Sequence, residues 1–285
     1  MLIANNWDDF EVLDAGNGEK LERWGEFILR RPDPQAIWNK SNLVLWDKAD
    51  AIYHRSKSGG GEWEFIKRVP EQWSVKYRNL DFVIKPTSFK HTGLFPEQAV
   101  NWDWIDKKIK DSKISFPKVL NLFGYTGGAT VAALAAGAEV VHVDASKGMI
   151  EIAKQNVSKS GLDGKPVRFF VDDVVKLVQR EIRRGNKYHG IIMDPPSFGR
   201  GTSGEVWEIE KSLNELVGLC NEILEEKPLF ILVNSYASEI SRYAIENILK
   251  DKLPKGKISS DELGLPIKNR EDMNLPCGST IRCEF

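Results

Sequence analysis

From residue 118 onward the chain alternates short apolar runs with longer amphipathic segments, and this alternation constrains the fold more than any other feature. Val, Ile and Leu dominate the short runs, whereas apolar residues recur every three or four positions in the longer segments, as helices require. Repeated strand-then-helix units with short connections predict an α/β fold with a doubly wound parallel sheet, whose ligands bind at the carboxyl ends of the strands. The expected strands are 118–123, 139–143, 167–171, 190–193, 229–233 and 279–285, and the expected helices are 129–136, 147–160, 173–184, 208–226 and 240–249.

The first 85 residues follow a different pattern, with six tryptophans and turn sequences such as AGNGE, RRPDP and SKSGGGE. Short β-forming runs between such turns predict a small antiparallel β domain at 1–85, followed by a second domain at 86–285. The tryptophans could stack on nucleic-acid bases, but bulky side chains that fill a small core explain them better. The expected strands are 10–13, 27–30, 51–55, 63–68, 75–77 and 80–85.

The composition argues against several classes of protein. Lys and Arg total 40 against 41 Asp and Glu, a net charge of −1, so the whole chain is not a strongly basic nucleic-acid binder. Cys220, Cys277 and Cys283 are widely spaced without a C-x-x-C pair, which predicts reduced thiols and no metal site. The N-terminus has no basic segment followed by a long apolar run, and we expect a cytoplasmic protein that does not enter membranes. A homodimer remains open.

A glycine-rich turn follows the first expected strand of the second domain, in the order Gly124-Tyr125-Thr126-Gly127-Gly128. Glycines there allow backbone N–H groups and a helix N-terminus to approach a ligand closely. The spacing G-x-x-G-G differs from the G-x-G-x-x-G of nicotinamide sites, and no Lys-Ser or Lys-Thr follows as in a P-loop.

Acidic residues end the next two expected strands. Asp144 lies about 20 residues after Gly124, where a carboxylate can accept the hydroxyl hydrogens of an adenosine ribose. The alternative is that Asp144 caps the following helix. One of Asp172 and Asp173 could accept a hydrogen bond from the adenine amino group, and Asp173 serves equally well as a helix cap.

The fourth expected strand ends in Asp194-Pro195-Pro196-Ser197-Phe198. Two prolines fix the backbone and offer no N–H donors, so the carboxylate and neighbouring carbonyls can accept hydrogen bonds from an amino group. Phe198 can stack on a planar substrate, and the loop at 199–204 has the composition of a lid or substrate loop. The alternative is a merely rigid exit from the strand.

These segments together resemble the class I S-adenosylmethionine-dependent methyltransferases. More narrowly, the chain resembles the large-subunit ribosomal-RNA methyltransferase group, in its branch without a PUA domain; the segments 90–98 and 275–278 add to the likeness. The resemblance implies a Rossmann-like fold, S-adenosyl-L-methionine as cofactor and an RNA partner. It implies the catalytic residues Asp194, Pro195, Pro196 and Phe198, and the cofactor contacts Gln98, Asn121, Phe123, Gly124, Tyr125, Thr126, Gly127, Asp144, Ala145, Asp172, Asp173 and Asp194.

One departure from that group affects the expected chemistry. Its cytosine-C5 members carry cysteines just after the fifth strand, where this chain reads Leu-Val-Asn-Ser-Tyr-Ala-Ser at 232–238. Transfer of the methyl group to a base nitrogen is therefore favoured over covalent cytosine chemistry, with Tyr125, Asn234 and Tyr236 as further candidates near the acceptor. The alternatives are a protein or small-molecule acceptor, an NAD-dependent oxidoreductase, and a non-catalytic RNA- or partner-binding protein that retains the fold.

Overall fold

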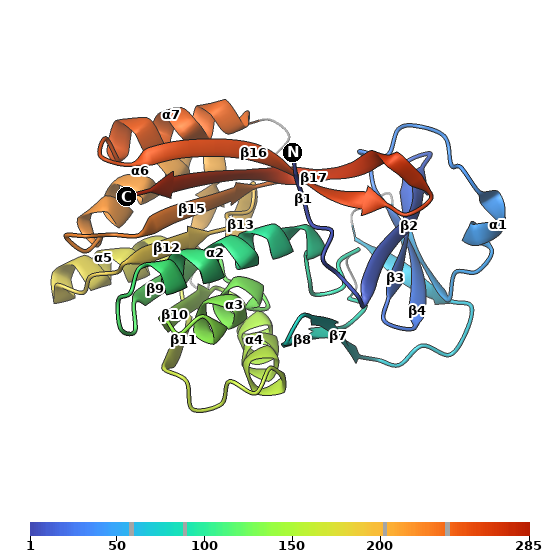
Figure 1. Cartoon of the computed structure of the whole chain (residues 1–285), viewed down its shortest axis with the longest axis horizontal. Helices are drawn as coiled ribbons and strands as arrows, with labels where there is room; N and C mark the ends of the chain where they lie inside the picture. The colour runs from blue at the N-terminus through green and yellow to red at the C-terminus, as the bar shows by residue number, and fades with distance from the viewer. Residues whose placement is uncertain (57–59, 88–89, 202–203, 237–239) are drawn as a thin grey trace. The chain divides into compact units, whose positions relative to one another are not determined.

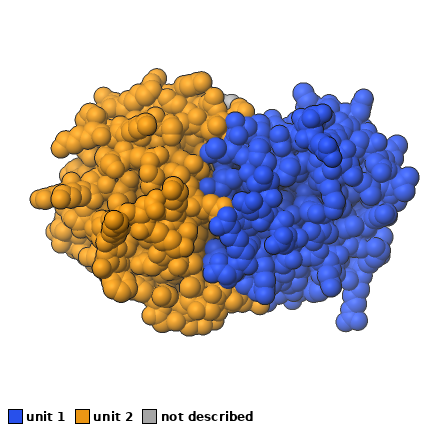
Figure 2. All heavy atoms as spheres, viewed as in Figure 1, with its two compact units in different colours: residues 1–100, 263–277 blue, residues 101–262, 278–285 orange. Residues whose placement is uncertain are grey.

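The computed structural model describes residues 1–56, 60–87, 90–201, 204–236 and 240–285, which form two compact units (Figures 1 and 2). Unit 1 comprises residues 1–100 and 263–277, and unit 2 comprises residues 101–262 and 278–285. The strands β16 (Lys257–Ile267) and β17 (Arg270–Glu284) therefore contribute residues to both. These units differ from the expected division at residue 85, because 86–100 and 263–277 group with unit 1; independently folding domains at 1–85 and 86–285 stay a prediction.

Unit 2 contains the predicted doubly wound sheet, in the strand order β11-β10-β9-β12-β15-β17. The first five strands are parallel, and β17 pairs antiparallel with β15. The strands are β9 (Lys118–Leu122), β10 (Glu139–Asp144), β11 (Val167–Val171), β12 (Gly190–Met193) and β15 (Phe230–Ser235), and β13 (Phe198–Arg200) and β14 (Val206–Glu208) form a separate hairpin. The helices are α2 (Ala99–Asp111), α3 (Gly128–Ala135), α4 (Lys147–Lys159), α5 (Val174–Arg184), α6 (Ile209–Glu222) and α7 (Arg242–Lys252).

The two faces of this sheet differ in chemistry. One face is a continuous apolar core, in which alternate strand residues such as Leu120, Leu122 and Met193 pack against α5, α6 and α7. The other face carries buried polar side chains, including Asn121, His142 and Asn234. Strand residues alternate between the faces, so both sets come from the same strands.

Unit 1 is built on an antiparallel meander of β2 (Phe10–Gly16), β3 (Glu19–Trp24) and β4 (Phe27–Pro32). The sheet continues through β5, which is parallel to β4, and ends at β6. The remaining elements are β1 (Leu2–Ile3), α1 (Leu43–Trp46), β5 (Ala51–Arg55), β6 (Gly61–Phe65), the hairpin β7 (Trp73–Tyr77) and β8 (Leu80–Ile84), and the short helix η1 (Pro96–Gln98).

The six tryptophans of unit 1 have structural partners. Each indole N–H donates a hydrogen bond within the unit, for example from Trp38 to the Ala15 carbonyl at 2.7 Å and from Trp46 to the Asp14 carboxylate at 2.9 Å. The other four donors are Trp7, Trp24, Trp63 and Trp73. These bonds support the core-filling interpretation over base stacking, because a buried indole N–H needs an internal acceptor.

Several elements differ from the sequence-based expectation. The strand β3, the helix α2 and the strand β16 were not expected, and β17 starts at Arg270 rather than 279. The helix expected to reach residue 226 ends at Glu222, because Leu224 forms a parallel bridge with Tyr188. The strand expected at 63–68 ends at Phe65, since the N–H groups of residues 66 and 67 bond to the Asp50 carbonyl.

Candidate active site at the carboxyl edge of the sheet

The predicted site residues of unit 2 follow neighbouring strands at one edge of the sheet. Leu122 of β9 pairs with Val143 of β10 on one side and with Met193 of β12 on the other. The segment after β9 therefore lies between Asp144 and Asp194, the residues that follow those two partners. Asn234, near the end of β15, follows Val233, the partner of Met193, and so neighbours Asp194 in the sheet register.

The turn after β9 has an unusual backbone. Phe123 and Tyr125 have φ values of 54° and 49°, and Gly127 has φ 84°. A non-glycine residue rarely adopts such angles, so the turn stores strain of a kind found at ligand sites. Gly124 is required for another reason, because a Cβ at this position would lie 2.4 Å from the His142 imidazole.

A buried polar cluster lies behind the turn. The Asn121 amide donates to the Thr130 hydroxyl at 2.9 Å, and the hydroxyl is 2.8 Å from Nδ1 of His142. Burial lowers the pKa of His142 to about 4, so the ring is neutral at pH 7. Asn156 of α4 donates to the Thr126 carbonyl at 2.7 Å. Asn121 and Thr126 are thus buried residues with structural hydrogen bonds at the glycine-rich turn, and a direct cofactor contact by either stays a prediction.

Asp144 accepts two backbone hydrogen bonds, from Tyr125 N–H at 2.9 Å and from Ser146 N–H at 2.8 Å. Burial raises the pKa of this carboxyl, although both hydrogen bonds oppose the shift. The N-cap of α4 is Ser146, whose hydroxyl accepts from Met149 N–H. Asp144 is therefore not the helix cap, and a ribose contact, with the exposed Ala145 beside it, stays the favoured prediction.

Asp172 and Asp173 have separate roles in the structure. Asp173 is the N-cap of α5 and accepts from Lys176 N–H at 2.9 Å. Asp172 forms an ion pair with Arg180 and accepts from Asp173 N–H at 2.9 Å. The capping interpretation of Asp173 is thus confirmed, which leaves Asp172 as the better candidate for an adenine contact.

The segment Asp194-Pro195-Pro196 is held against the glycine turn by Trp207. The Trp207 indole donates to the Pro196 carbonyl at 2.7 Å, and its ring meets that of Phe123 edge to face at 4.8 Å between centroids. No pattern in the sequence indicated this role of Trp207, which precedes a helix in an apparently irregular segment. Phe123 is therefore a packing residue as well as a predicted cofactor neighbour.

Phe198 begins the hairpin β13–β14 and is 56% exposed. It is available for stacking, but no described contact tests that role. The loop expected at 199–204 is partly regular, since Gly199 and Arg200 pair with Trp207 and Val206. Positions 202 and 203 lie outside the described residues.

Two further predictions concern Gln98 and the cysteines. Gln98 ends η1 in unit 1 and is buried there, and its cofactor contact stays a prediction. Cys220 is fully buried in the apolar core of α6, where burial raises its pKa, and burial also raises the pKa of Cys283 to about 12. Both thiols are thus unsuited to attack a base.

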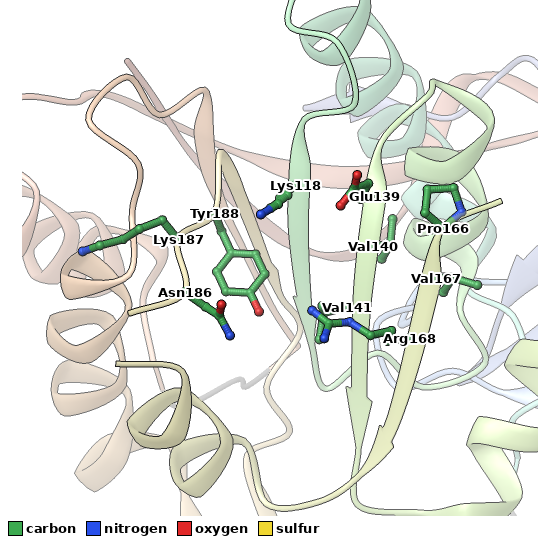
Figure 3. A pocket seen from close by; sticks show the side chains of 10 residues that line it. All are labelled: Lys118, Glu139, Val140, Val141, Pro166, Val167, Arg168, Asn186, Lys187 and Tyr188. Carbon is green, nitrogen blue, oxygen red and sulfur yellow. The ribbon is translucent and has the colours of Figure 1, made fainter. Parts of the chain in front are cut away.

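One cavity of unit 2 does not coincide with this site. It holds about 200 Å³ and is lined by the first residues of three parallel strands, Lys118, Glu139 and Val167, together with Arg168 and Tyr188 (Figure 3). It therefore opens at the amino edge of the sheet, whereas nucleotide ligands of doubly wound sheets bind at the carboxyl edge. Strand register is the better guide to the active site here.

Two features are absent from the described residues. No group of three or more His, Cys, Asp or Glu side chains there is arranged to hold a metal ion. No helix within those same residues is long and apolar enough to cross a membrane.

The parallel sheet, the strained glycine turn and the carboxylates that follow adjacent strands define a Rossmann-like protein with a nucleotide cofactor site. A family model for S-adenosylmethionine-dependent methyltransferases matches residues 41–224, and the chain belongs to this family. Its methyl donor is S-adenosyl-L-methionine, as the resemblance implied.

Known relatives agree with this assignment. The chain is 41% identical over 243 residues to ribosomal RNA large subunit methyltransferase I of Erwinia tasmaniensis, covering 77% of this chain and 56% of that protein. The Aeromonas salmonicida protein of the same name is 30% identical over 256 residues, covering 88% of this chain and 59% of the relative. The crystal structure of a SAM-dependent methyltransferase from Agrobacterium tumefaciens superposes with a TM-score of 0.95 at 38% identity, covering 99% of this chain and 92% of that one.

These matches also set limits. The chain spans less than two thirds of the length of the two ribosomal-RNA methyltransferases. Membership of the methyltransferase family therefore does not assign their substrate to this chain. The homodimer that the sequence left open gains no support from them. The oxidoreductase alternative is wrong, because the family model is that of a methyltransferase.

Proposed function

We propose that the protein transfers a methyl group from S-adenosylmethionine to a nitrogen of a base in large-subunit ribosomal RNA. The observation that carries the proposal is the Asp194-Pro195-Pro196 segment, which follows β12 directly beside the glycine turn after β9. The names of the Erwinia and Aeromonas relatives support RNA as the acceptor.

The turn and its neighbours fit the cofactor. A side chain at Gly124 would collide with the buried His142, so glycine lets the turn pack closely on the polar cluster behind it. Asp144 is fixed by two backbone N–H groups and has lone pairs left for the ribose hydroxyls. Asp172 would receive the adenine amino group.

The bound cofactor would supply a methyl group on a sulfonium, which leaves with its bonding electrons remaining on sulfur. The chain's task is to align the acceptor nitrogen, whose lone pair forms the new N–CH₃ bond. Alignment of this kind contributes roughly 7–11 kcal/mol to catalysis. Asp194 would hold an N–H of the acceptor and stabilise positive charge that develops on it, while Pro195 and Pro196 keep its backbone rigid.

A nitrogen acceptor is favoured over cytosine C5 because a covalent route needs a thiolate at the carboxyl edge. The end of β15 carries Asn234 and Ser235 instead, and Cys220 is enclosed in the core on the opposite face. A protein or small-molecule acceptor has no specific observation in its favour. A cytoplasmic location follows from the proposal, because ribosomal RNA is modified where ribosomes assemble.

The test uses the full chain, radiolabelled S-adenosylmethionine and large-subunit rRNA transcribed in vitro, followed by digestion to nucleosides and mass spectrometry. We expect a nucleoside methylated on nitrogen. Asp194→Asn should lower kcat by about 100-fold or more, the usual size of a lost catalytic carboxylate. Asp251→Asn, the same charge change at an exposed position of α7, should leave the rate unchanged. Methylation at C5 of cytosine would contradict the nitrogen acceptor, and transfer only to protein would contradict the RNA substrate.

A further inference from the structure

A chain of buried and partly buried hydrogen bonds crosses the polar face of unit 2 and ends at Asn234. Arg282 of β17 donates to Oδ1 of Asn101 on α2, from Nε at 3.2 Å and from an Nη at 2.7 Å. The Thr280 hydroxyl donates to the same oxygen at 3.2 Å. Asn101 in turn donates from Nδ2 to Oδ1 of Asn234 at 3.0 Å.

The direction of this chain is fixed by charge. A guanidinium has only donors, so the Asn101 atom that meets Arg282 must be its oxygen. Burial lowers the pKa of Arg282 to about 10, which still leaves it charged at pH 7. The amide nitrogen of Asn101 must therefore face Asn234, and the Asn234 atom that meets it must be the oxygen. Two amides that could each be turned over are thus held in one orientation.

The same geometry leaves the Nδ2 group of Asn234 for a ligand. Asn234 is only 3% exposed, yet within the described residues its sole side-chain hydrogen bond is the one through Oδ1. Its nitrogen is also absent from the fully enclosed polar atoms of those residues that lack a partner. A nearly buried amide with two N–H donors and no internal acceptor lies at an edge where ligands bind.

Asn234 of β15 and Asp194, the first residue after β12, directly follow the paired residues Val233 and Met193. Val233 and Met193 both belong to the apolar core, and successive strand residues point to opposite faces, so the residues that follow them begin on the polar face. A donor therefore lies next to an acceptor, at the place where the acceptor base is expected under the proposed function.

We propose that Asn234 is a substrate-binding residue that donates a hydrogen bond to the acceptor base, and that Arg282 and Asn101 are positioning residues that fix its orientation. The inference rests on the proposed function for the nature of the substrate. The complementary substrate group is an amine or imine N–H adjacent to a ring nitrogen or carbonyl oxygen, with the N–H facing Asp194 and the lone pair facing Asn234. Uncharged methyl acceptors without this pair of groups would be rejected, because one buried polar group would lose its partner.

The first test replaces the donor alone. Asn234→Asp keeps the oxygen that faces Asn101 but turns the N–H₂ into an oxygen, which repels the lone pair of the base. On large-subunit rRNA transcribed in vitro, we expect kcat/KM to fall by about 30-fold or more, with the affinity for S-adenosylmethionine changed less than about threefold. Asn214→Asp, the same change at an exposed position of α6, should leave both quantities unchanged. Equal rates for the two variants, or a loss of cofactor affinity as large as the loss of rate, would overturn the assignment of Asn234.

The second test reverses the orientation without touching Asn234. Asn101→Asp still accepts from Arg282 and Thr280 but can no longer donate, so Asn234 must turn over and donate to the introduced carboxylate. We expect a loss of kcat/KM comparable to that of Asn234→Asp, whereas Asn214→Asp, the same change at an exposed position of α6, should retain the wild-type rate. Thermal unfolding of each variant identifies those that fail to fold.

A readout independent of activity separates this inference from the proposed function. The ¹⁵N side-chain amide signal of Asn234, assigned by its loss in Asn234→Asp, should exchange with solvent faster in the native protein, where it has no acceptor, than in Asn101→Asp, where it donates to the carboxylate. Unchanged exchange would refute the positioning by Arg282 and Asn101. If the wild-type protein methylates no RNA while the exchange behaves as expected, ribosomal RNA is not the substrate. The orientation of Asn234 by Arg282 and Asn101 is then still supported.

Discussion

Replacement of Gly124 by alanine tests the structural basis of the cofactor turn most directly. The added Cβ would lie 2.4, 2.6 and 2.8 Å from three atoms of the His142 ring, distances that real Cβ atoms essentially never show. The ring cannot move aside freely, because it is buried, bonded to Thr130 and packed against Phe169 at 5.3 Å. The clash must therefore displace the turn itself.

The expected cost is that of overpacking a core, about 1–3 kcal/mol. For a unit of this size that corresponds to a fall in Tm of roughly 2–10 °C. Because the displaced turn carries the backbone next to Asp144, we also expect the affinity for S-adenosylmethionine to fall by about tenfold or more, or about 1.4 kcal/mol. Denaturant unfolding and isothermal titration measure the two effects.

The control is Gly148→Ala in α4, where the nearest atom to an added Cβ is the Ser146 hydroxyl at 3.8 Å. This change should be neutral or stabilising by up to about 1 kcal/mol, because alanine is the better helix former. A double-mutant cycle with His142→Ala should show coupling, since removal of the ring makes room for the new methyl group. Equal stability of the two alanine variants, or strict additivity with His142→Ala, would refute the steric explanation.

The remaining predictions concern three carboxylates. Asp144→Asn should weaken the binding of S-adenosylmethionine and make that binding independent of pH in the acidic range. Burial raises the pKa of Asp144, so in the native protein the carboxylate that accepts the ribose hydroxyls becomes protonated at a higher pH than an ordinary aspartate. The raised pKa of Asp144 also affects stability: its contribution to the free energy of unfolding should fall as the pH rises above 3.8, the ordinary pKa of an aspartate. Denaturant unfolding of the native protein and of Asp144→Asn at pH values above 3.8 tests the direction of this change. Asp173→Ala should lower the free energy of unfolding by about 1 kcal/mol, because it removes a helix cap, and should leave the affinity for the cofactor unchanged. Asp172→Ala should weaken cofactor binding with a smaller effect on stability. If only Asp173→Ala weakened cofactor binding, Asp173 and not Asp172 would be the adenine contact.

The sheet of unit 2 could be predicted because its signals are local. Strands such as Gly190–Met193 are buried on both faces and appear as unbroken apolar runs, and the helix at Val174–Arg184 has a clear apolar stripe that ends at Gly185. The order of acidic residues along the chain then places the site, because successive parallel strands end at the same edge.

The missed elements lack such signals. The strand β3 contains Glu22, which is fully buried but paired with Arg31, so a core position appears polar in the sequence. The helix α2 is the exception, because it buries Ala99, Trp102, Ile105 and Ile109 at helical spacing and could have been predicted from these positions. The bond from Trp207 to Pro196 joins two residues whose proximity depends on a hairpin, which no periodicity indicates.

The polar face of the sheet explains why the site was harder to predict than the fold. Asn121, Thr130 and His142 are hydrogen-bonded in series behind the cofactor turn, and Arg282, Asn101 and Asn234 form a second series. Among the described residues, Nε2 of His142 is buried without a partner. A buried polar group costs stability unless it is bonded, so the series that begins at the donor-only guanidinium of Arg282 has one favoured arrangement. An apolar core of equal volume would hold the strands together but would leave amides at its edge free to turn over. The polar face therefore fixes the direction of hydrogen bonds at the site. The residues that do so are far apart in the sequence, more than a hundred positions for Asn101 and Asn234, so no local pattern predicts their contact.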